Sequence, residues 1–411
     1  MNYKLTKKPT TIILLACLVV FLSLSSFIQN NYSSLQKKSL DFSGTNSLFI
    51  EYKDGLNFNW ITNKKDSGYY ELRDSKDKLI TQGKTSFSRV HQIKIPTEIK
   101  SYLTFKFGGV NSKKHTIKLQ EQKNTPILTP KNIDSIYVIG DVHGRYDKLI
   151  HLLQKSKVID HNLNWIAGKA SLVFLGDVFD RGNQVTKVLW FINQLEEKAK
   201  NAGGKVYLVL GNHEIMIMSK DLRYLSRKES SIPLAYKVTY DYLFHPKKSY
   251  LGNWLRSKKS VLKIDNALFA HGGIIDLQTK NIYEFNQKVS SYLIKPEFLD
   301  LMKKSPDTTK YKAIDWHQMK HFFYSDKSPF WYRGYVYSDT LNKQLRAMLK
   351  KYDSKIHIVA HTPLKTITEK YNGKLLTTDL NDAATELLLL VKKKKRYKKY
   401  KINSDGKISD L

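Results

Sequence analysis

Five short apolar runs in the sequence each end directly in polar side chains that can bind a metal ion or a phosphate. They are YVIG before DVHGR, VFLG before DVFDRG, LVLG before NHE, ALFA before HGG and HIVA before HT. A strand that ends in such groups normally presents them to a ligand, because burying an unpaired carboxylate costs several kcal/mol. One such cluster could be a salt-bridged turn, but five at strand ends predict an α/β active site.

The side chains in these clusters are imidazoles, carboxylates and an amide, with no thiolate. This set suits two divalent metal ions such as Mn, Fe or Zn. Six ligands are too many for one open catalytic zinc site, but they fit two metals that share one carboxylate. Asp177 lies in the middle of the set and would be the bridge. The expected metal ligands are Asp141, His143, Asp177, Asn212, His271 and His361.

The chain contains two regions with different hydrophobic patterns, and the second of them contains these residues. From about residue 134, apolar runs too continuous for half-exposed strands alternate with helical patterns such as QVTKVLWFINQLEEKAK, which predicts β-α-β order. Residues 40–125 instead contain about seven short alternating or aromatic runs, which predict a small β-sandwich of immunoglobulin or fibronectin-like type acting as a spacer or docking module. The segment KNTPILTPKN separates the two regions. The seven runs are SLFIEY, FNWIT, YYELR, KLITQG, HQIKI, SYLTFKF and HTIKLQ.

The chain is strongly basic, with 69 Lys and Arg against 37 Asp and Glu and a net charge of +32. Such a charge can favour binding to nucleic acid, to an anionic membrane or to an acidic substrate. No zinc-finger spacing, aromatic RNA-binding pattern or basic helix accompanies it, so no nucleic-acid partner is expected. The charge is densest in KKKKRYKKYK, residues 392–401, which we interpret as a solvated edge strand or tail. Contact with an anionic membrane surface is the alternative.

The N-terminus carries the pattern of a targeting segment. An apolar run at 12–28 follows Lys4, Lys7 and Lys8, which predicts a signal peptide or an N-terminal membrane anchor within residues 1–30. The single cysteine, Cys17, excludes an intramolecular disulfide. It lies in a lipoprotein-like LLAC, but the apolar residues that continue after it argue against lipidation. We expect an exported protein, periplasmic or anchored to the outer side of the cytoplasmic membrane.

Four of the motifs together resemble a known family. GDVHG, GDVFDRG, GNHE and HGG, in this order, are similar to the calcineurin-like metallophosphoesterases, in particular the phosphoprotein phosphatases. PFWYRGY at 329–335, followed by VAHT, resembles the Shewanella-like, bacterial-type branch more than the eukaryotic Ser/Thr enzymes, whose Ser-Ala-Pro-Asn-Tyr motif is absent. The resemblance implies a four-layer α/β/β/α sandwich at 134–391. The all-β domain at 40–125 would precede it and a basic C-terminal tail at 392–411 would follow.

The resemblance also assigns roles to matching positions. Asp141 and His143 would hold the first metal, Asp177 would bridge, and Asn212, His271 and His361 would hold the second. His213 would be the general acid, oriented by Asp180, and Arg181 and Arg333 would hold the phosphate. We expect Glu214 to start a helix and Arg145 to lie at the surface or rim.

The expected reaction is hydrolysis of a phosphomonoester by in-line attack of a metal-activated hydroxide. The substrate would be a protein phosphorylated on Ser, Thr or Tyr, or a small phosphomonoester. One alternative is a dinucleoside tetraphosphate hydrolase built on the same metal motifs. Another is a catalytically inactive envelope-binding protein, against which the complete ligand set argues.

Overall fold

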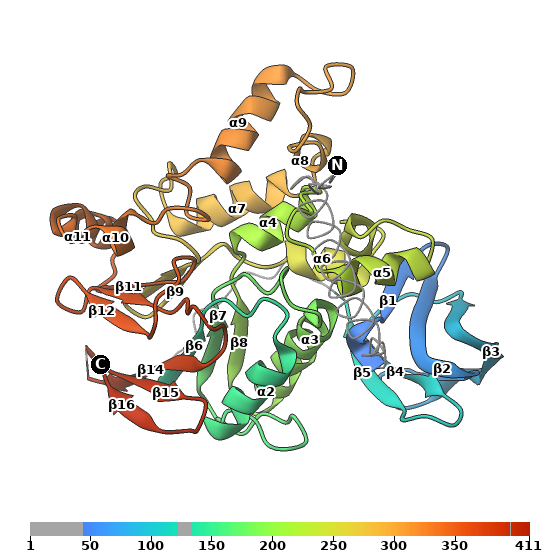
Figure 1. Ribbon diagram of the computed structural model, residues 1–411. Helices are drawn as coiled ribbons and strands as arrows, with labels where there is room; N and C mark the ends of the chain where they lie inside the picture. Colours follow the sequence, from blue (N-terminus) through green and yellow to red (C-terminus); the bar gives the residue numbers. More distant parts are fainter. Residues whose placement is uncertain (1–43, 122–133, 395) are drawn as a thin grey trace, which may run out of the picture. The chain divides into compact units, whose positions relative to one another are not determined.

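The computed structural model describes residues 44–121, 134–394 and 396–411 (Figure 1). The expected signal or anchor segment at 1–30, with Cys17, and the segment KNTPILTPKN at 123–132 lie outside these ranges. Among the described residues, no helix has both the length and the apolar character needed to cross a membrane.

Two β-sheets form the centre of residues 134–411. The first has the strand order β16-β15-β14-β6-β7-β8, and the second has the order β12-β13-β11-β10-β9. Strands β6, β7 and β8 are parallel, as are β10, β11 and β13. The bounds are β6 Ser135–Ile139, β7 Ser171–Phe174, β8 Lys205–Leu208, β9 Val261–Ile264, β10 Ala267–Ala270, β11 Ile356–Val359, β12 Thr368–Lys370, β13 Leu375–Thr377, β14 Glu386–Lys393, β15 Arg396–Asn403 and β16 Ile408–Asp410.

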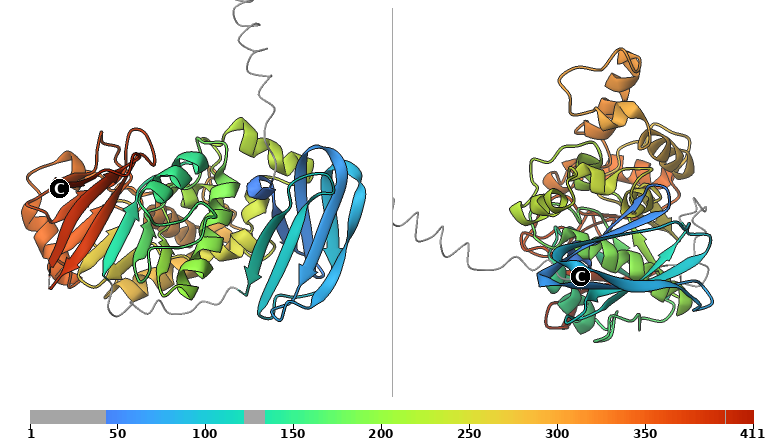
Figure 2. Two further views of the ribbon diagram at one scale, coloured as in Figure 1. Left: turned by 90° about the horizontal axis from the view of Figure 1, so that it is seen from below. Right: turned by 90° about the vertical axis from the view of Figure 1, so that its right-hand side faces the viewer.

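The two sheets pack on each other through alternate side chains. Val138 and Val173 of the first sheet share one buried cluster with Phe269 and Ile358 of the second. All four residues of β7 and of β10 are buried, which explains why these strands read as continuous apolar runs and not as alternating ones. The protein therefore has a mixed α/β fold in which paired sheets are flanked by helices (Figure 2).

Helices cover the sheets and form the segments between the strands. Helix α3 packs against β8, and α7 packs against β9. The helix bounds are α2 Tyr146–Lys155, α3 Val185–Asn201, α4 Asn212–Met218, α5 Arg227–Ala235, α6 Tyr250–Arg256, α7 Ile282–Tyr292, α8 Pro296–Leu299, α9 Ala313–Tyr324, α10 Gly334–Tyr337 and α11 Asn342–Lys351, with 3-10 turns η1 Gly44–Asn46 and η2 Asp241–Phe244.

The N-terminal strands form one five-stranded antiparallel sheet, which we call the N-terminal sheet. The sequence predicts a β-sandwich of about seven short strands, but the described residues of this region form a single sheet of five. FNWIT and YYELR both lie in β2, and LITQG and HQIKI both lie in β3. The polar residues between these runs do not turn the chain, because the β2–β3 pairing continues past them through a register shift. The bounds are β1 Phe49–Tyr52, β2 Leu56–Arg73, β3 Leu79–Ile95, β4 Tyr102–Gly109 and β5 His115–Gln120.

The N-terminal sheet shares a continuous hydrophobic core with helices of the following region. Trp190 of α3 donates its indole N–H to the carbonyl oxygen of Leu48 at 3.0 Å. The same indole stacks on Tyr250, with ring centroids 5.4 Å apart. The hydroxyl of Tyr242 donates to the Glu51 carboxylate at 2.5 Å. A spacer detached from the following region would not make these contacts, so the N-terminal sheet is packed against that region.

The basic C-terminal run belongs to the first sheet and is not a separate tail. Strand β14 pairs with β6 and with β15, so this run extends the same sheet as β6–β8 (Figure 2, red strands). Tyr397 packs on the core between the sheets, while Ile402 packs on the other core, so both faces of β15 carry apolar side chains. Some of its lysines are neutralised: Lys392 pairs with Asp265 at 3.1 Å and Lys399 with Glu369 at 2.7 Å.

Candidate active site

The strand ends of both sheets bring the predicted residues together. Asp141 and His143 follow β6, Asp177 and Asp180 follow β7, and Asn212 and His213 begin α4 after β8. His271 follows β10 and His361 follows β11, which belong to the second sheet. Because parallel strands deliver their carboxyl ends to one edge of a sheet, each sheet contributes part of one site.

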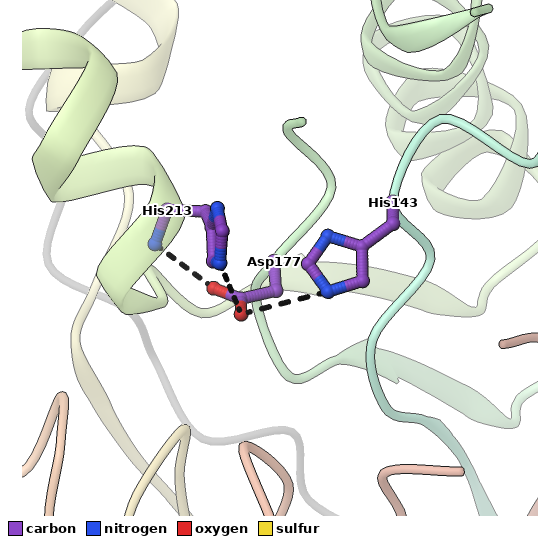
Figure 3. Close-up of side chains that lie close together, drawn as sticks. All are labelled: His143, Asp177 and His213. Atoms are coloured by element: carbon purple, nitrogen blue, oxygen red, sulfur yellow. Dashed lines mark hydrogen bonds and ion pairs between the residues drawn. The ribbon is translucent and has the colours of Figure 1, made fainter. Parts of the chain in front are cut away.

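Asp177 lies at the centre of this site. It forms one group with His143 and His213 and another with His271 and His361, and within each group the potential ligand atoms lie within 4.8 Å of one another. Its Oδ2 lies 3.9 Å from Nε2 of His143 and 3.7 Å from Nε2 of His213 (Figure 3). Its Oδ1 instead lies 3.2 Å from Nε2 of His271. Each carboxylate oxygen therefore faces a different set of imidazoles, as a bridging ligand requires.

The imidazoles are oriented as metal ligands. Nδ1 of His143 lies 2.7 Å from the carbonyl oxygen of Phe179, and Nδ1 of His271 lies 2.6 Å from that of Leu175. A carbonyl accepts only from an N–H, so Nδ1 carries a proton, and Nε2 is the atom of each ring that is left to face Asp177 and a metal ion. Among the described residues, Nε2 of His143 and of His361 is buried and has no hydrogen-bond partner. These unsatisfied atoms fit divalent metal ions.

The electrostatics of the site favour a cation at the same place. Burial lowers the pKa of His271, but the Asp177 carboxylate outweighs burial and raises that pKa to about 10. Burial raises the pKa of Asp177, but His271 and His213 hold it well below its ordinary value. The carboxylate therefore stays ionised and attracts positive charge, which two metal ions would supply.

The two remaining predicted ligands, Asp141 and Asn212, lie next to the histidines of the site. Oδ2 of Asp141 is 3.3 Å from Nε2 of His143, and its Oδ1 accepts the backbone N–H of His361 at 3.3 Å. Oδ1 of Asn212 is 2.8 Å from Nε2 of His271. When the His271 ring is neutral with its proton on Nδ1, Nε2 and the amide oxygen are both acceptors, and a divalent cation between them would suit both.

The backbone of the site is held in a conformation that residues with a side chain rarely adopt. Positive φ angles outside glycine are uncommon, and each costs on the order of 1–3 kcal/mol unless its surroundings enforce it. Such angles cluster at functional sites, where neighbouring structure fixes the side chains. Here they occur at His143 (45°), Asp177 (52°), Asp180 (68°), Arg181 (61°) and His361 (66°).

His213 and Asp180 form a buried pair beside Asp177. Nδ1 of His213 lies 2.5 Å from Oδ2 of Asp180, and both side chains are almost completely buried. Oδ1 of Asp180 is buried and has no hydrogen-bond partner within the part of the chain that the structure describes. Because His213 also belongs to one of the two candidate metal groups, its geometry fits a proton donor and a metal ligand alike.

Two arginines place positive charge near different histidines of the site. Burial and His271 lower the pKa of His361 to about 2, and Arg333 adds to this effect. Burial lowers the pKa of His143 and the Asp141 carboxylate raises it to about 8, while Arg181 opposes the rise. Arg333 also donates to the carbonyl oxygen of His361, which fixes its position. Arg181 is exposed, as a group that meets a ligand from solution must be.

Two carboxylates, Glu214 and Asp379, have roles in the site that the sequence analysis did not predict. Glu214 accepts the backbone N–H groups of Asp177 and Val178 at 2.8 Å and of Gly211 at 2.7 Å, so it joins two of the ligand-bearing loops. Asp379 is buried, and burial together with Asp141 raises its pKa to about 8. It follows β13, a buried strand of sequence LLT, which is too short to stand out in the sequence as an apolar run.

Comparison with known proteins agrees with this geometry. The profile described as calcineurin-like phosphoesterase matches residues 135–365. The chain belongs to the calcineurin-like phosphoesterase family. It is therefore a metallophosphoesterase, a hydrolase that uses divalent metal ions.

Two curated relatives illustrate different members of this family. The chain is 28% identical to Shewanella-like protein phosphatase 1 of Plasmodium berghei over 241 residues, which is 55% of this chain and 60% of the relative. It is 36% identical to the symmetrical bis(5'-nucleosyl)-tetraphosphatase of Escherichia coli over 176 residues, which is 40% of this chain and 54% of that relative. The chain thus spans less than two thirds of either relative.

A solved structure extends the similarity over most of the chain. The cold-active protein-tyrosine phosphatase of a psychrophilic Shewanella species aligns with a TM-score of 0.66 and 26% identity. The alignment covers 89% of this chain and 98% of that one. Residues 134–411 alone could not supply such a share, so the likeness reaches into the N-terminal strands.

Proposed function

We propose that this metallophosphoesterase is a phosphoprotein phosphatase that removes phosphate from Tyr, Ser or Thr side chains with His213 as the general acid. The observation that carries the proposal is the buried contact of 2.5 Å between Nδ1 of His213 and Asp180, beside the central carboxylate Asp177. An alkoxide or phenoxide is a poor leaving group and needs a proton as it departs. The pair supplies that proton.

The metal ions would be held by the six side chains that converge on the site. Asp141 and His143 would bind the first ion, Asn212, His271 and His361 the second, and Asp177 both. Mn, Fe or Zn all suit this set of nitrogen and oxygen ligands. When bound, two such ions withdraw charge from the phosphoryl oxygens and make water a competent nucleophile near neutral pH.

The residues of the chain would then complete the reaction. His213 gives the proton on Nε2 to the leaving oxygen, because its Nδ1 faces Asp180. The Asp180 carboxylate orients the imidazole, so that Nε2 points towards the leaving oxygen. Arg181 and Arg333 hold the phosphate from two sides, because a guanidinium can donate two parallel hydrogen bonds to phosphate oxygens.

A dinucleoside tetraphosphate hydrolase is the second candidate, favoured by the identity of 36% to the Escherichia coli tetraphosphatase. A nucleotide phosphate leaves without much help, however, so such a reaction gains little from the Asp180–His213 pair. The pair therefore favours monoesters.

Steady-state kinetics on the metal-loaded protein test this proposal. We expect kcat/KM for phosphotyrosyl or phosphoseryl peptides to exceed that for diadenosine tetraphosphate. A higher kcat/KM for the dinucleotide than for every peptide would contradict it. Absence of turnover for all of them would favour the inactive envelope-binding alternative.

We also infer that the protein is exported and acts outside the cytoplasm. The inference rests on the apolar run at 12–28 behind three lysines. Cell fractionation of the full chain tests it, and recovery in the soluble cytoplasmic fraction would contradict it.

A further inference from the structure

Tyr224 stands beside the proposed proton donor. Its ring centroid lies 5.4 Å from that of His213, with the planes tilted by 49°. His213 is 3% exposed, whereas Tyr224 is 49% exposed. Among the described residues, the only other ring that contacts His213 is that of His143, which is buried with it. Tyr224 is thus the aromatic neighbour of His213 that a substrate can reach.

Two interactions hold Tyr224 in this place. Its carbonyl oxygen accepts the backbone N–H of Arg181 at 3.0 Å, which ties it to the loop that carries Asp180. The guanidinium carbon of Arg223 lies 5.7 Å from the centre of its ring. Arg223 is itself fixed by two bonds to the buried Asp221, of 2.8 Å from Nε and 2.7 Å from Nη2. The ring is therefore presented in a defined position and not as a free surface side chain.

The position of the proton donor determines where the leaving group lies. Nδ1 of His213 faces Asp180, so only Nε2 can protonate the leaving oxygen. The group attached to that oxygen must then lie next to the His213 ring, where Tyr224 also lies. Aromatic rings attract one another at centroid separations of about 4.5–7 Å. A phenyl leaving group placed there can pack on Tyr224, whereas the short alkyl chain of a serine ester cannot.

We propose that Tyr224 is a specificity-determining residue that favours aryl over alkyl phosphomonoesters by packing on the leaving group. This inference rests on the proposed phosphatase function and on His213 as its proton donor. Trp331 does not fit the same task, because its ring lies 5.6 Å from His361, a candidate metal ligand, and its indole N–H is bonded to the carbonyl oxygen of Phe323.

Kinetics with matched peptides test the role of Tyr224. The wild type, Tyr224→Leu and Tyr224→Phe are compared on one peptide sequence carrying either phosphotyrosine or phosphoserine. In Tyr224→Leu we expect KM for the phosphotyrosyl peptide to rise about three- to tenfold, with kcat and the phosphoseryl kinetics changed by less than about twofold. The contact exists in the bound substrate as well as in the transition state, so it acts on KM. Tyr224→Phe keeps the ring and should retain the wild-type preference.

Other outcomes overturn the inference. Equal losses on both peptides would mean that Tyr224 only supports the fold of the site, and so would a fall in kcat without a change in preference. A Tyr224→Phe variant that behaves like Tyr224→Leu would show that the hydroxyl matters and not the ring. Tyr283→Leu is the matched control, because Tyr283 is an exposed tyrosine, 63% exposed, on α7.

A binding experiment separates this inference from the proposed function. Calorimetry measures phenylphosphonate and ethylphosphonate, which cannot be hydrolysed, on the metal-loaded wild type and Tyr224→Leu. If the wild type hydrolyses no monoester but prefers phenylphosphonate, and Tyr224→Leu loses that preference, the phosphatase function fails but the packing of an aryl group on Tyr224 stands. Equal binding of the two phosphonates by both proteins would contradict the role of Tyr224.

Discussion

At the scale of single residues, the contact between Asp180 and His213 predicts how the rate depends on the leaving group. In Asp180→Asn the amide no longer stabilises a charged imidazole, so proton donation weakens. We expect kcat to fall by about 10²–10⁴-fold for alkyl phosphates and far less for activated aryl phosphates, which leave unaided. A series of aryl phosphates of increasing leaving-group pKa measures this dependence. A loss that is the same across the series would contradict the role of Asp180.

His213→Ala serves as the companion variant, because His213 also belongs to a candidate metal group. A general acid can be removed without loss of metal, so this variant should keep the metal content of the wild type while losing activity. Metal analysis of the dialysed protein decides the matter. Loss of one ion per chain would make His213 a ligand and would remove the basis for its role as acid.

Glu214 leads to a second prediction. Its two oxygens accept three backbone N–H groups. In Glu214→Gln one acceptor becomes a donor, which leaves a buried N–H unpaired and loosens the loop of Asp177. We expect metal affinity to fall about 10–100-fold, as when a group that supports a ligand is changed. Metal titration measures it, with the exposed Glu98→Gln as control. Unchanged affinity would show that the loop holds its shape without this carboxylate.

The residues of the metal site could be predicted from the sequence because each follows an apolar strand. The hydrogen bonds of Glu214 could not be predicted. Its partners Asp177 and Val178 are 37 and 36 positions away in the chain, and they are backbone groups with no side-chain pattern to reveal them. The positive φ angles at His143 and His361 were equally hidden, because histidine adopts such angles more often than most residues but still only in a small minority of cases.

At the scale of elements, the strands that are buried on both faces could be predicted from the sequence. The points at which a strand continues through a polar segment could not. β7 and β10 are continuous apolar runs and were recognised as buried strands. In β2 the polar segment between FNWIT and YYELR reads as a turn, but pairing with β3 carries it through as an irregular strand. In β15 the lysines obscure an alternation that puts Tyr397 and Ile402 on opposite faces.

His357 of β11 predicts a pH dependence of stability. Its Nδ1 donates to the carbonyl oxygen of Leu268 at 3.0 Å and its Nε2 accepts the N–H of Ile274 at 3.2 Å, so the buried ring must be neutral. Burial lowers its pKa from 6.5 to about 4. The unfolded chain therefore takes up this proton first, and the stability that the neutral ring contributes is complete above about pH 6.5 and is lost as the pH falls towards 4.

Urea unfolding of the wild type and His357→Gln measures this effect. The difference in free energy of unfolding between the two proteins should shrink by up to about 3 kcal/mol between pH 7 and pH 4, because other titrating groups are common to both. A difference that does not change with pH would contradict the assignment.

At the scale of the whole molecule, the N-terminal sheet and the phosphoesterase region share one core, so we expect them to unfold together. Trp190 links them through Leu48 and Tyr250. Trp190→Ala should lower the free energy of unfolding by about 3–5 kcal/mol, as expected for a buried tryptophan, with one transition retained. Chemical unfolding followed by fluorescence and circular dichroism measures it, with the exposed Tyr283→Ala as control. Two separate transitions in the wild type would show that the parts are independent.

The central claim is a two-metal centre bridged by Asp177, and one variant tests it most directly. Asp177→Asn replaces the shared carboxylate with a neutral amide, which cannot offset the repulsion between two divalent cations. Metal content and phosphomonoesterase activity are measured on the same sample, beside the exposed control Asp405→Asn. We predict that Asp177→Asn retains less metal than the wild type and loses at least about 10³-fold in turnover. Wild-type metal content with activity within about tenfold of the wild type would contradict the two-metal account.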